Sequence, residues 1–225
     1  RTSNALNEFF RISHELLKNH PVNKKRRSEG KPPANAIIPW GAGKLPCIKP
    51  FQEKYKLKAA CIAAVSLIKG IAKLAGIKSI EVPGATGYID TDTFAKADAA
   101  LRTIKTYDMV ILHVEGPDEA SHEGNVEGKI SIIRKIDSMV GRIIDNIDLD
   151  EVSVVLLADH ATSIRHRKHT GDPVPIILAS SEVLRDEVQR YNEREACRGG
   201  LGRIQGRHVM PLILNLIGRP EVLGG

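Results

Sequence analysis

Carboxylate and imidazole side chains gather in three short segments of this 225-residue sequence. Asp118 and His122 are four positions apart, so one turn of helix would place both on one face. Asp159 and His160 directly follow an apolar run, and His169 comes nine residues after His160. Mixed carboxylate and imidazole donors suit Zn²⁺ or Mn²⁺, because carboxylate oxygen neutralises charge and neutral imidazole binds borderline-soft cations.

Five such side chains are more than a protein usually contributes to one catalytic metal. Two metals about 4 Å apart would use all five and would stabilise both oxygens of a phosphoryl transfer. The Asp118–His122 pair also has a simpler interpretation, since an Asp-x-x-x-His pair is often only a surface contact on a helix. The remaining histidines lack such a context and are expected at the surface or beside the site, with His113 left open. They are His14, His20, His113, His166 and His208.

An α/β fold would bring these segments together. Short apolar runs, typical of strands buried on both faces, alternate with amphipathic stretches typical of helices. We predict strands at 59–65, 80–82, 109–114, 152–158 and 174–179, and helices at 67–75, 93–105, 126–147 and 208–217. This alternation predicts the α/β class, with a largely parallel central sheet flanked by helices. Ligands gather beyond the carboxyl ends of such strands, and Asp118 and Asp159 each follow a predicted strand.

The first 33 residues differ from the rest. Apolar residues at helical spacing from Leu6 to Leu17 predict an amphipathic helix that ends by Pro21. The stretch 22–33 is polar, basic and interrupted by glycine and proline, which predicts a loop. We therefore divide the chain into residues 1–33, with an amino-terminal helix from a second domain, and residues 34–225, which form the metal-binding domain.

Composition disfavours several classes of protein. Hydrophobic residues make up 42% and charged residues 27%, as is ordinary for a soluble globular protein. The formal charge of +6 suits an anionic partner, but the few aromatic residues are not interleaved with basic ones as a nucleic-acid stacking surface requires. No apolar run approaches the length of a membrane span, and the three cysteines form no zinc-type pair. We expect a cytoplasmic protein that binds neither nucleic acid nor a membrane.

Several segments resemble archaeal-type 2,3-bisphosphoglycerate-independent phosphoglycerate mutases, which belong to the alkaline phosphatase superfamily. The similar segments are 35–44, 67–71, 82–87 and the two metal motifs, in order and in spacing. The resemblance implies an alkaline phosphatase-like fold, with residues 1–33 as the end of an inserted substrate-binding domain and its linker. It also implies that 3-phosphoglycerate and 2-phosphoglycerate are interconverted through a phosphoserine, without 2,3-bisphosphoglycerate as a cofactor.

The resemblance further implies roles for individual residues. It places one divalent metal on Asp118, His122 and His169. A second metal would be held by Asp159 and His160, together with an upstream aspartate and serine. We expect Mn²⁺, with Mg²⁺, Zn²⁺ and Co²⁺ as alternatives. Because the nucleophilic serine of the family is expected upstream of this chain, we assign no catalytic residue and expect the chain alone to be inactive.

Arg26 and Lys69 are our candidates for holding the substrate, because its phosphate and carboxylate need cationic partners. Arg26 lies in a family-like Asn-Lys-Lys-Arg run, and Lys69 lies near a predicted junction of strand and helix. The alternative interpretation is a solvated basic loop for Arg26 and a helix-surface lysine for Lys69. Trp40, with Gly41 and Gly43, is expected either in a tight loop near the site or as a buried packing residue.

Other functions remain alternatives. A metal-dependent phosphatase, sulfatase or other phosphotransferase of the same superfamily would also need two metals and a nucleophile. A basic RNA- or DNA-binding module would instead show steep salt dependence that is indifferent to the metal ligands. A nicotinamide-binding enzyme is disfavoured, because no GxGxxG motif joins a strand to a helix. The expected partner is phosphoglycerate, and a homo-oligomer is left open.

Overall fold

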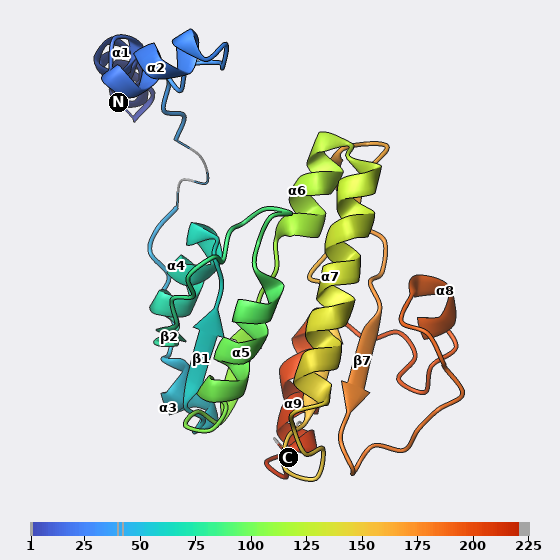
Figure 1. Cartoon of the computed structure of the whole chain (residues 1–225). Coiled ribbons are helices and arrows are strands. Elements are labelled where there is room, and N and C mark those ends of the chain that lie inside the picture. The colour runs from blue at the N-terminus through green and yellow to red at the C-terminus, as the bar shows by residue number, and fades with distance from the viewer. Residues whose placement is uncertain (1, 40, 42, 221–225) are drawn as a thin grey trace. The chain divides into compact units, whose positions relative to one another are not determined.

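The computed structural model describes residues 2–39, 41 and 43–220 of the chain (Figure 1). Contacts between Cα atoms divide the chain into two compact units, Arg1–Cys47 and Ile48–Gly225. The substrate-binding and metal-binding roles given to residues 1–33 and 34–225 stay predictions. Trp40 lies outside the described residues, so its predicted loop also stays a prediction.

The first unit contains two helices, α1 (Thr2–Lys18) and α2 (Pro21–Ser28). Helix α2 takes up residues 22–28 of the loop predicted for 22–33, so the prediction is wrong for these residues, while 29–33 are turn and irregular structure as expected. Proline is favoured at the first position of a helix, and the His20 side chain caps α2 by accepting a hydrogen bond from Val22 N at 3.3 Å. The helix was missed because its polar sequence has no apolar periodicity.

Asn23 fixes α2 within the first unit. Its side chain is 2% exposed and donates to the backbone oxygens of Leu17 and Ala34 at 2.7 and 2.9 Å. The side-chain oxygen accepts from Ala34 N at 2.8 Å. One buried amide therefore ties α2 both to the end of α1 and to the segment that follows α2.

Helices and strands alternate through the second unit. In chain order they are α3 (Phe51–Tyr55), β1 (Ala59–Ile62), α4 (Ser66–Leu74), β2 (Lys78–Ser79), α5 (Thr93–Thr103), β3 (Met109–Leu112), α6 (Gly116–Glu123), α7 (Val126–Ile144), β4 (Val154–Leu157), β5 (Ala161–Ser163), β6 (Lys168–Thr170), β7 (Ile176–Ala179), α8 (Glu193–Ala196), the 3₁₀ turn η1 (Gly206–His208) and α9 (Val209–Leu216). The four predicted helices match α4, α5, α7 and α9 to within three residues. None of the helices in the described residues is both long and apolar enough to cross a membrane.

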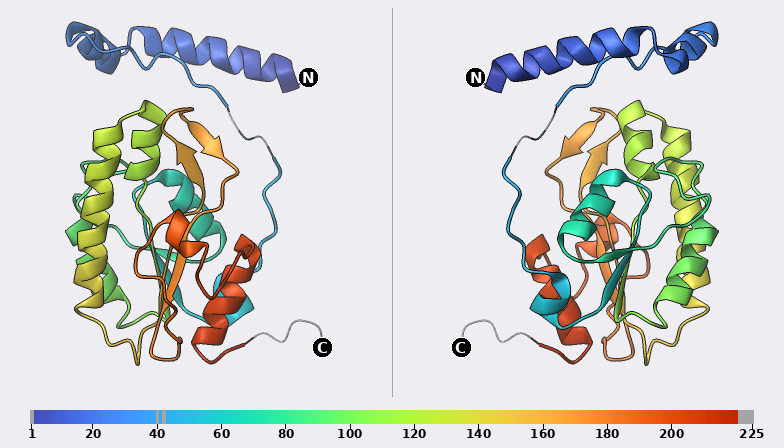
Figure 2. Two further views of the ribbon diagram at one scale, coloured as in Figure 1. Left: turned by 90° about the vertical axis from the view of Figure 1, so that its right-hand side faces the viewer. Right: turned by 90° about the vertical axis from the view of Figure 1, so that its left-hand side faces the viewer.

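The strands confirm the predicted α/β class with a parallel sheet flanked by helices. Strand β1 lies between β2 and β3 and is parallel to both, with Ala60 opposite Lys78 and Val110. Strands β4 and β7 pair antiparallel, and β5 and β6 form an antiparallel hairpin. In Figure 2, α5 and α7 cover one side of the strands, while α3 and α9 lie on the other.

Two details of the strand prediction need correction. The strand predicted at 80–82 is observed at Lys78–Ser79. Just beyond this strand, Ile80 N donates a hydrogen bond to Cys61 O of β1 at 2.9 Å. The β5–β6 hairpin was not predicted, although it falls within the segment that contains the candidate ligand His169. Strands of two or three residues are too short to show a period of two in sequence.

The core of the second unit surrounds β1. All four residues of β1 are at most 7% exposed, and Ala97 of α5 and Ile132 of α7 are fully buried. Full burial of an isoleucine side chain is worth about 1.5–3 kcal/mol relative to exposure. Helix α7 packs along both α5 and α6 (Figure 1), so the position of α6 depends on this apolar contact.

Gly116 lets α6 begin close to its neighbours. A Cβ atom at this position would lie 2.9 Å from Ile132 Cγ1 and 3.0 Å from the Tyr88 backbone oxygen. Real side chains do not make contacts this short, and backbone atoms cannot move aside cheaply. Glycine is therefore required where the chain leaves β3 and enters the helix that contains Asp118.

We expect Gly116→Ala to destabilise the protein by about 1–3 kcal/mol, because the added methyl group overpacks the contact with α7. Urea unfolding followed by circular dichroism measures this change. Gly141→Ala on α7 is the matched control, since a Cβ atom there meets nothing within 4 Å. It should stabilise the helix by about 0.5–1 kcal/mol. Equal effects of the two substitutions would contradict the packing role of Gly116.

Candidate metal centre

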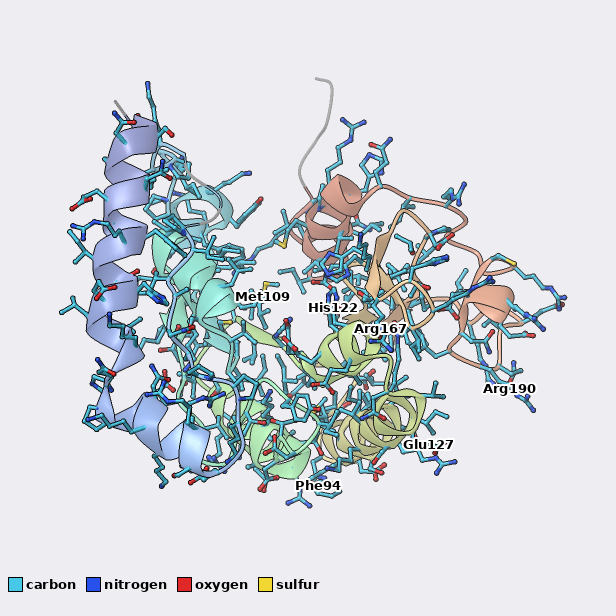
Figure 3. All side chains as sticks on the ribbon, turned by 90° about the horizontal axis from the view of Figure 1, so that it is seen from above. Phe94, Met109, His122, Glu127, Arg167 and Arg190 are labelled. Atoms are coloured by element: carbon cyan, nitrogen blue, oxygen red, sulfur yellow. The ribbon has the colours of Figure 1, made fainter. Side chains whose placement is uncertain are left out.

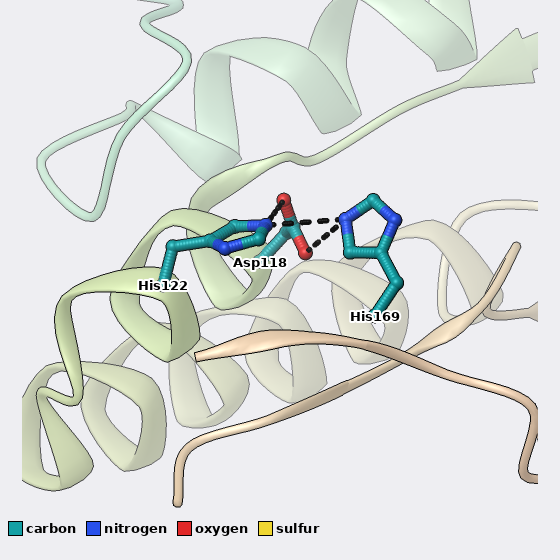
Figure 4. A group of neighbouring side chains, drawn as sticks. All are labelled: Asp118, His122 and His169. Carbon is teal, nitrogen blue, oxygen red and sulfur yellow. Dashed lines mark hydrogen bonds and ion pairs between the residues drawn. The ribbon is translucent and has the colours of Figure 1, made fainter. Parts of the chain in front are cut away.

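Asp118, His122 and His169 point toward one another in the second unit (Figure 4). His122 Nε2 lies 3.3 Å from Asp118 Oδ2, and His169 Nε2 lies 3.5 Å from Asp118 Oδ1. The two Nε2 atoms are 3.1 Å apart. One potential ligand atom from each residue falls within 4.8 Å of the others. The structure thus brings together the three residues that were predicted to hold the first metal.

Two elements supply these side chains. Helix α6 places Asp118 and His122 one turn apart on the same face. The β5–β6 hairpin supplies His169, which pairs directly with Thr162 in the register of the two strands. Opposite residues of an antiparallel pair extend to the same side of the sheet, so Thr162 and His169 both face α6.

The hydrogen bond of His122 determines which of its ring nitrogens is free. His122 Nδ1 lies 2.9 Å from the backbone oxygen of Arg167, and Figure 3 shows these two residues side by side. A carbonyl oxygen only accepts, so Nδ1 donates its proton and Nε2 of the neutral ring keeps a lone pair. Arg167 has a left-handed φ of 53°, which turns the hairpin where its carbonyl meets His122.

The donor set fits a divalent cation. The Nε2 lone pair of His122 faces the Asp118 carboxylate and His169 Nε2 at close range. Electron-rich atoms that face one another repel unless a proton or a cation lies between them. One carboxylate and two imidazoles, one of them oriented by a backbone carbonyl, form a set typical of Zn²⁺ or Mn²⁺.

Of the second predicted set, His160 lies against this cluster. Its ring stacks on the ring of His169, with 3.8 Å between the centroids, and its Nδ1 is 3.1 Å from Thr162 Oγ1. Asp159 Oδ2 is 3.5 Å from His160 Nε2, and the Asp159 side chain is 69% exposed. The imidazole of this set is therefore beside the cluster, and its carboxylate is open to solvent.

The carboxyl end of β3 is rich in negative charge. Burial raises the pKa of Glu115, and the carboxylate of Asp118 raises it further. Burial lowers the pKa of His113, whose Nε2 lies 3.3 Å from Glu115 Oε2. His113 Nδ1 is buried and has no hydrogen-bond partner within the part of the chain described. His113, which the sequence left open, thus lies beside the cluster and outside its three-residue ligand set.

The two predicted substrate-binding residues have other partners. Arg26 lies on α2, in the first unit, and not on the expected loop; its Nε donates to Pro32 O at 2.8 Å. Lys69 lies on α4, and its Nζ is 2.7 Å from Glu81 Oε2. A substrate anion would have to compete with Glu81 for Lys69. Both substrate roles stay predictions.

Similarity to known proteins extends along nearly all of the chain. The model of a family described as the metalloenzyme superfamily matches residues 5–216, which include every residue of the cluster. The chain belongs to the metalloenzyme superfamily. Membership implies that the protein binds divalent metal, and it leaves the identity of the metal open.

Curated relatives in the metalloenzyme superfamily are longer than this chain. The chain is 46% identical over 224 residues to the 2,3-bisphosphoglycerate-independent phosphoglycerate mutase of Methanococcus vannielii. It is also 46% identical to 2,3-bisphosphoglycerate-independent phosphoglycerate mutase 1 of Methanocaldococcus jannaschii. These matches cover all of the chain but only 55% and 54% of the relatives, so the chain spans about half of their length. The expected resemblance to archaeal cofactor-independent phosphoglycerate mutases is confirmed.

Solved structures show the same similarity. A Pyrococcus horikoshii protein, 40% identical, superposes with a TM-score of 0.87 over 100% of this chain and 59% of its own. A cofactor-independent phosphoglycerate mutase from Thermoplasma acidophilum, 28% identical, superposes with a TM-score of 0.63 over 96% of this chain and 52% of its own. Both superpositions support the α/β fold of the metalloenzyme superfamily.

In this metalloenzyme-superfamily protein, we expect His169→Ala to weaken Mn²⁺ binding at least about tenfold, because the substitution removes a proposed ligand. Calorimetric titration of chelator-stripped protein measures the affinity. His166→Ala is the matched control, since His166 is exposed in the same hairpin and its Nδ1 contacts Ser163 Oγ at 3.1 Å. Equal loss of affinity in both variants, or no loss in either, would refute the assignment of His169.

Proposed function

We propose that the protein interconverts 3-phosphoglycerate and 2-phosphoglycerate by a metal-dependent phosphoryl transfer. The main support is the convergence of Asp118, His122 and His169. This convergence occurs in a chain that is 46% identical along its length to an archaeal phosphoglycerate mutase. The relative's printed activity is a property of that longer protein, so the activity proposed here belongs to a protein that contains this chain.

The side chains have complementary tasks in this proposal. Asp118 contributes negative charge, and His122 contributes an Nε2 lone pair whose direction the Arg167 carbonyl fixes. His169 closes the set from the hairpin, while Asp159 and His160 are proposed to hold a second cation. Bound divalent cations would neutralise charge on the phosphate oxygens and would favour ionisation of an attacking hydroxyl. We propose Mn²⁺, with Mg²⁺, Zn²⁺ and Co²⁺ as alternatives.

Ser121, which directly precedes the proposed ligand His122, is unsuited to be the nucleophile. Ser121 is fully buried, donates to Pro117 O at 2.7 Å, and accepts from Lys129 Nζ at 2.7 Å. A nucleophile must instead be accessible to substrate and close to a base or a metal. In our proposal the phosphoryl group is accepted by a serine outside these 225 residues, and no serine of the chain is assigned.

Assay of the complete protein with 3-phosphoglycerate tests the proposal. Formation of 2-phosphoglycerate without added 2,3-bisphosphoglycerate is the expected result, and enolase can be used to detect it. A chelator should abolish the activity and Mn²⁺ should restore it. Release of inorganic phosphate alone would contradict the mutase and support a phosphatase of the same superfamily.

We expect Asp118→Asn to lower kcat/KM for this conversion by at least about 100-fold, because the amide removes the negative charge at the proposed metal. His166→Ala is again the control and should keep wild-type activity. If the Asp118→Asn protein is folded by circular dichroism and has unchanged activity, the metal cluster is not required for the conversion.

A further inference from the structure

We propose that Thr162 is a positioning residue that orients one ligand from each of the two metal sets. Its Oγ1 lies 2.5 Å from Asp118 Oδ1 and 3.1 Å from His160 Nδ1. Asp118 belongs to the first set and His160 to the second. This inference rests on the proposed function, because it assumes that both residues bind metal.

The direction of the two hydrogen bonds follows from the groups involved. A threonine hydroxyl has a single proton, and an ionised carboxylate can only accept. The Thr162 hydroxyl therefore donates to Asp118 and accepts from the Nδ1–H group of His160. Neutral His160 then has its lone pair on Nε2, which is the nitrogen left to bind a cation. Thr162 thus selects the tautomer of one ligand while it fixes the carboxylate of the other.

Thr162 is held firmly enough to perform this task. The residue is 8% exposed and pairs with His169 in the hairpin. Its backbone oxygen accepts from Lys129 Nζ at 3.2 Å, and the same Nζ donates to Ser121 Oγ on α6. Lys129 therefore ties α6 and β5 to α7. A β-branched side chain on such a backbone has little rotamer freedom, so its hydroxyl has a defined direction.

Two substitutions distinguish the contribution of the Thr162 hydroxyl from that of its methyl group. Thr162→Val keeps the shape of the side chain and removes both hydrogen bonds, whereas Thr162→Ser keeps the hydroxyl. In the complete protein, we expect Thr162→Val to weaken Mn²⁺ binding at both sites by about tenfold or more, as is usual for partners that orient metal ligands. We expect Thr162→Ser to bind within about threefold of wild type, since such an orienting bond would be retained.

Calorimetric titration with Mn²⁺ measures these affinities, and a thermal melt of each variant measures its stability. Thr103→Val is the matched control, because Thr103 is also 8% exposed and its hydroxyl donates to Ala99 O within α5. This control should lower the melting temperature and leave Mn²⁺ binding unchanged. Nitrogen NMR of the metal-free protein gives a second readout: His160 should be protonated at Nδ1 in wild type and should lose this preference in Thr162→Val.

These measurements test the positioning role of Thr162 separately from the proposed function. Wild-type affinity in Thr162→Val, weakening of one site alone, or failure of Thr162→Ser to retain binding would overturn the positioning role. A wild-type protein that binds none of Mn²⁺, Mg²⁺, Zn²⁺ and Co²⁺ would overturn the proposed function itself. In that case the NMR result still shows whether Thr162 sets the tautomer of His160, so the two failures are distinguishable.

Discussion

Hydrogen bonds between α6 and the β5–β6 hairpin determine the geometry of the whole candidate site. His122 of α6 bonds to the Arg167 carbonyl in the turn of the hairpin, and Asp118 of α6 accepts from Thr162 of β5. Lys129 of α7 reaches both elements, through Ser121 on α6 and the Thr162 backbone oxygen. These contacts hold the ligands on α6 close to His169 on the hairpin.

This arrangement requires a proton or a cation between the facing atoms. A carboxylate and two imidazole nitrogens face one another within 3.5 Å. Burial raises the pKa of the neighbouring Glu115, and the carboxylates of Asp118 and Glu119 raise it further. The packing of α6 on α7 and the hydrogen bonds between α6 and the hairpin hold these groups close together. A cation that binds only the folded form would stabilise it by about 2.7 kcal/mol at a concentration one hundred times its Kd.

Sequence reasoning found the parts of the site that depend on local pattern. The spacing of Asp118 and His122 predicted a shared helix face, and the helices with strong apolar periods were placed to within three residues. The hairpin was missed because its strands have three residues each and its left-handed turn residue is arginine, not glycine. Thr162 was missed for a deeper reason. Its contacts to Asp118 and His160 exist only once the register of the hairpin and the position of α6 are known.

X-ray diffraction from crystals grown with Mn²⁺, recorded at the manganese absorption edge, would show whether Asp118, His122 and His169 bind one cation together. We predict an anomalous peak bound jointly by the Asp118 carboxylate and the Nε2 atoms of His122 and His169. A map with no anomalous density among these three side chains, or with the three side chains turned away from one another, would contradict it.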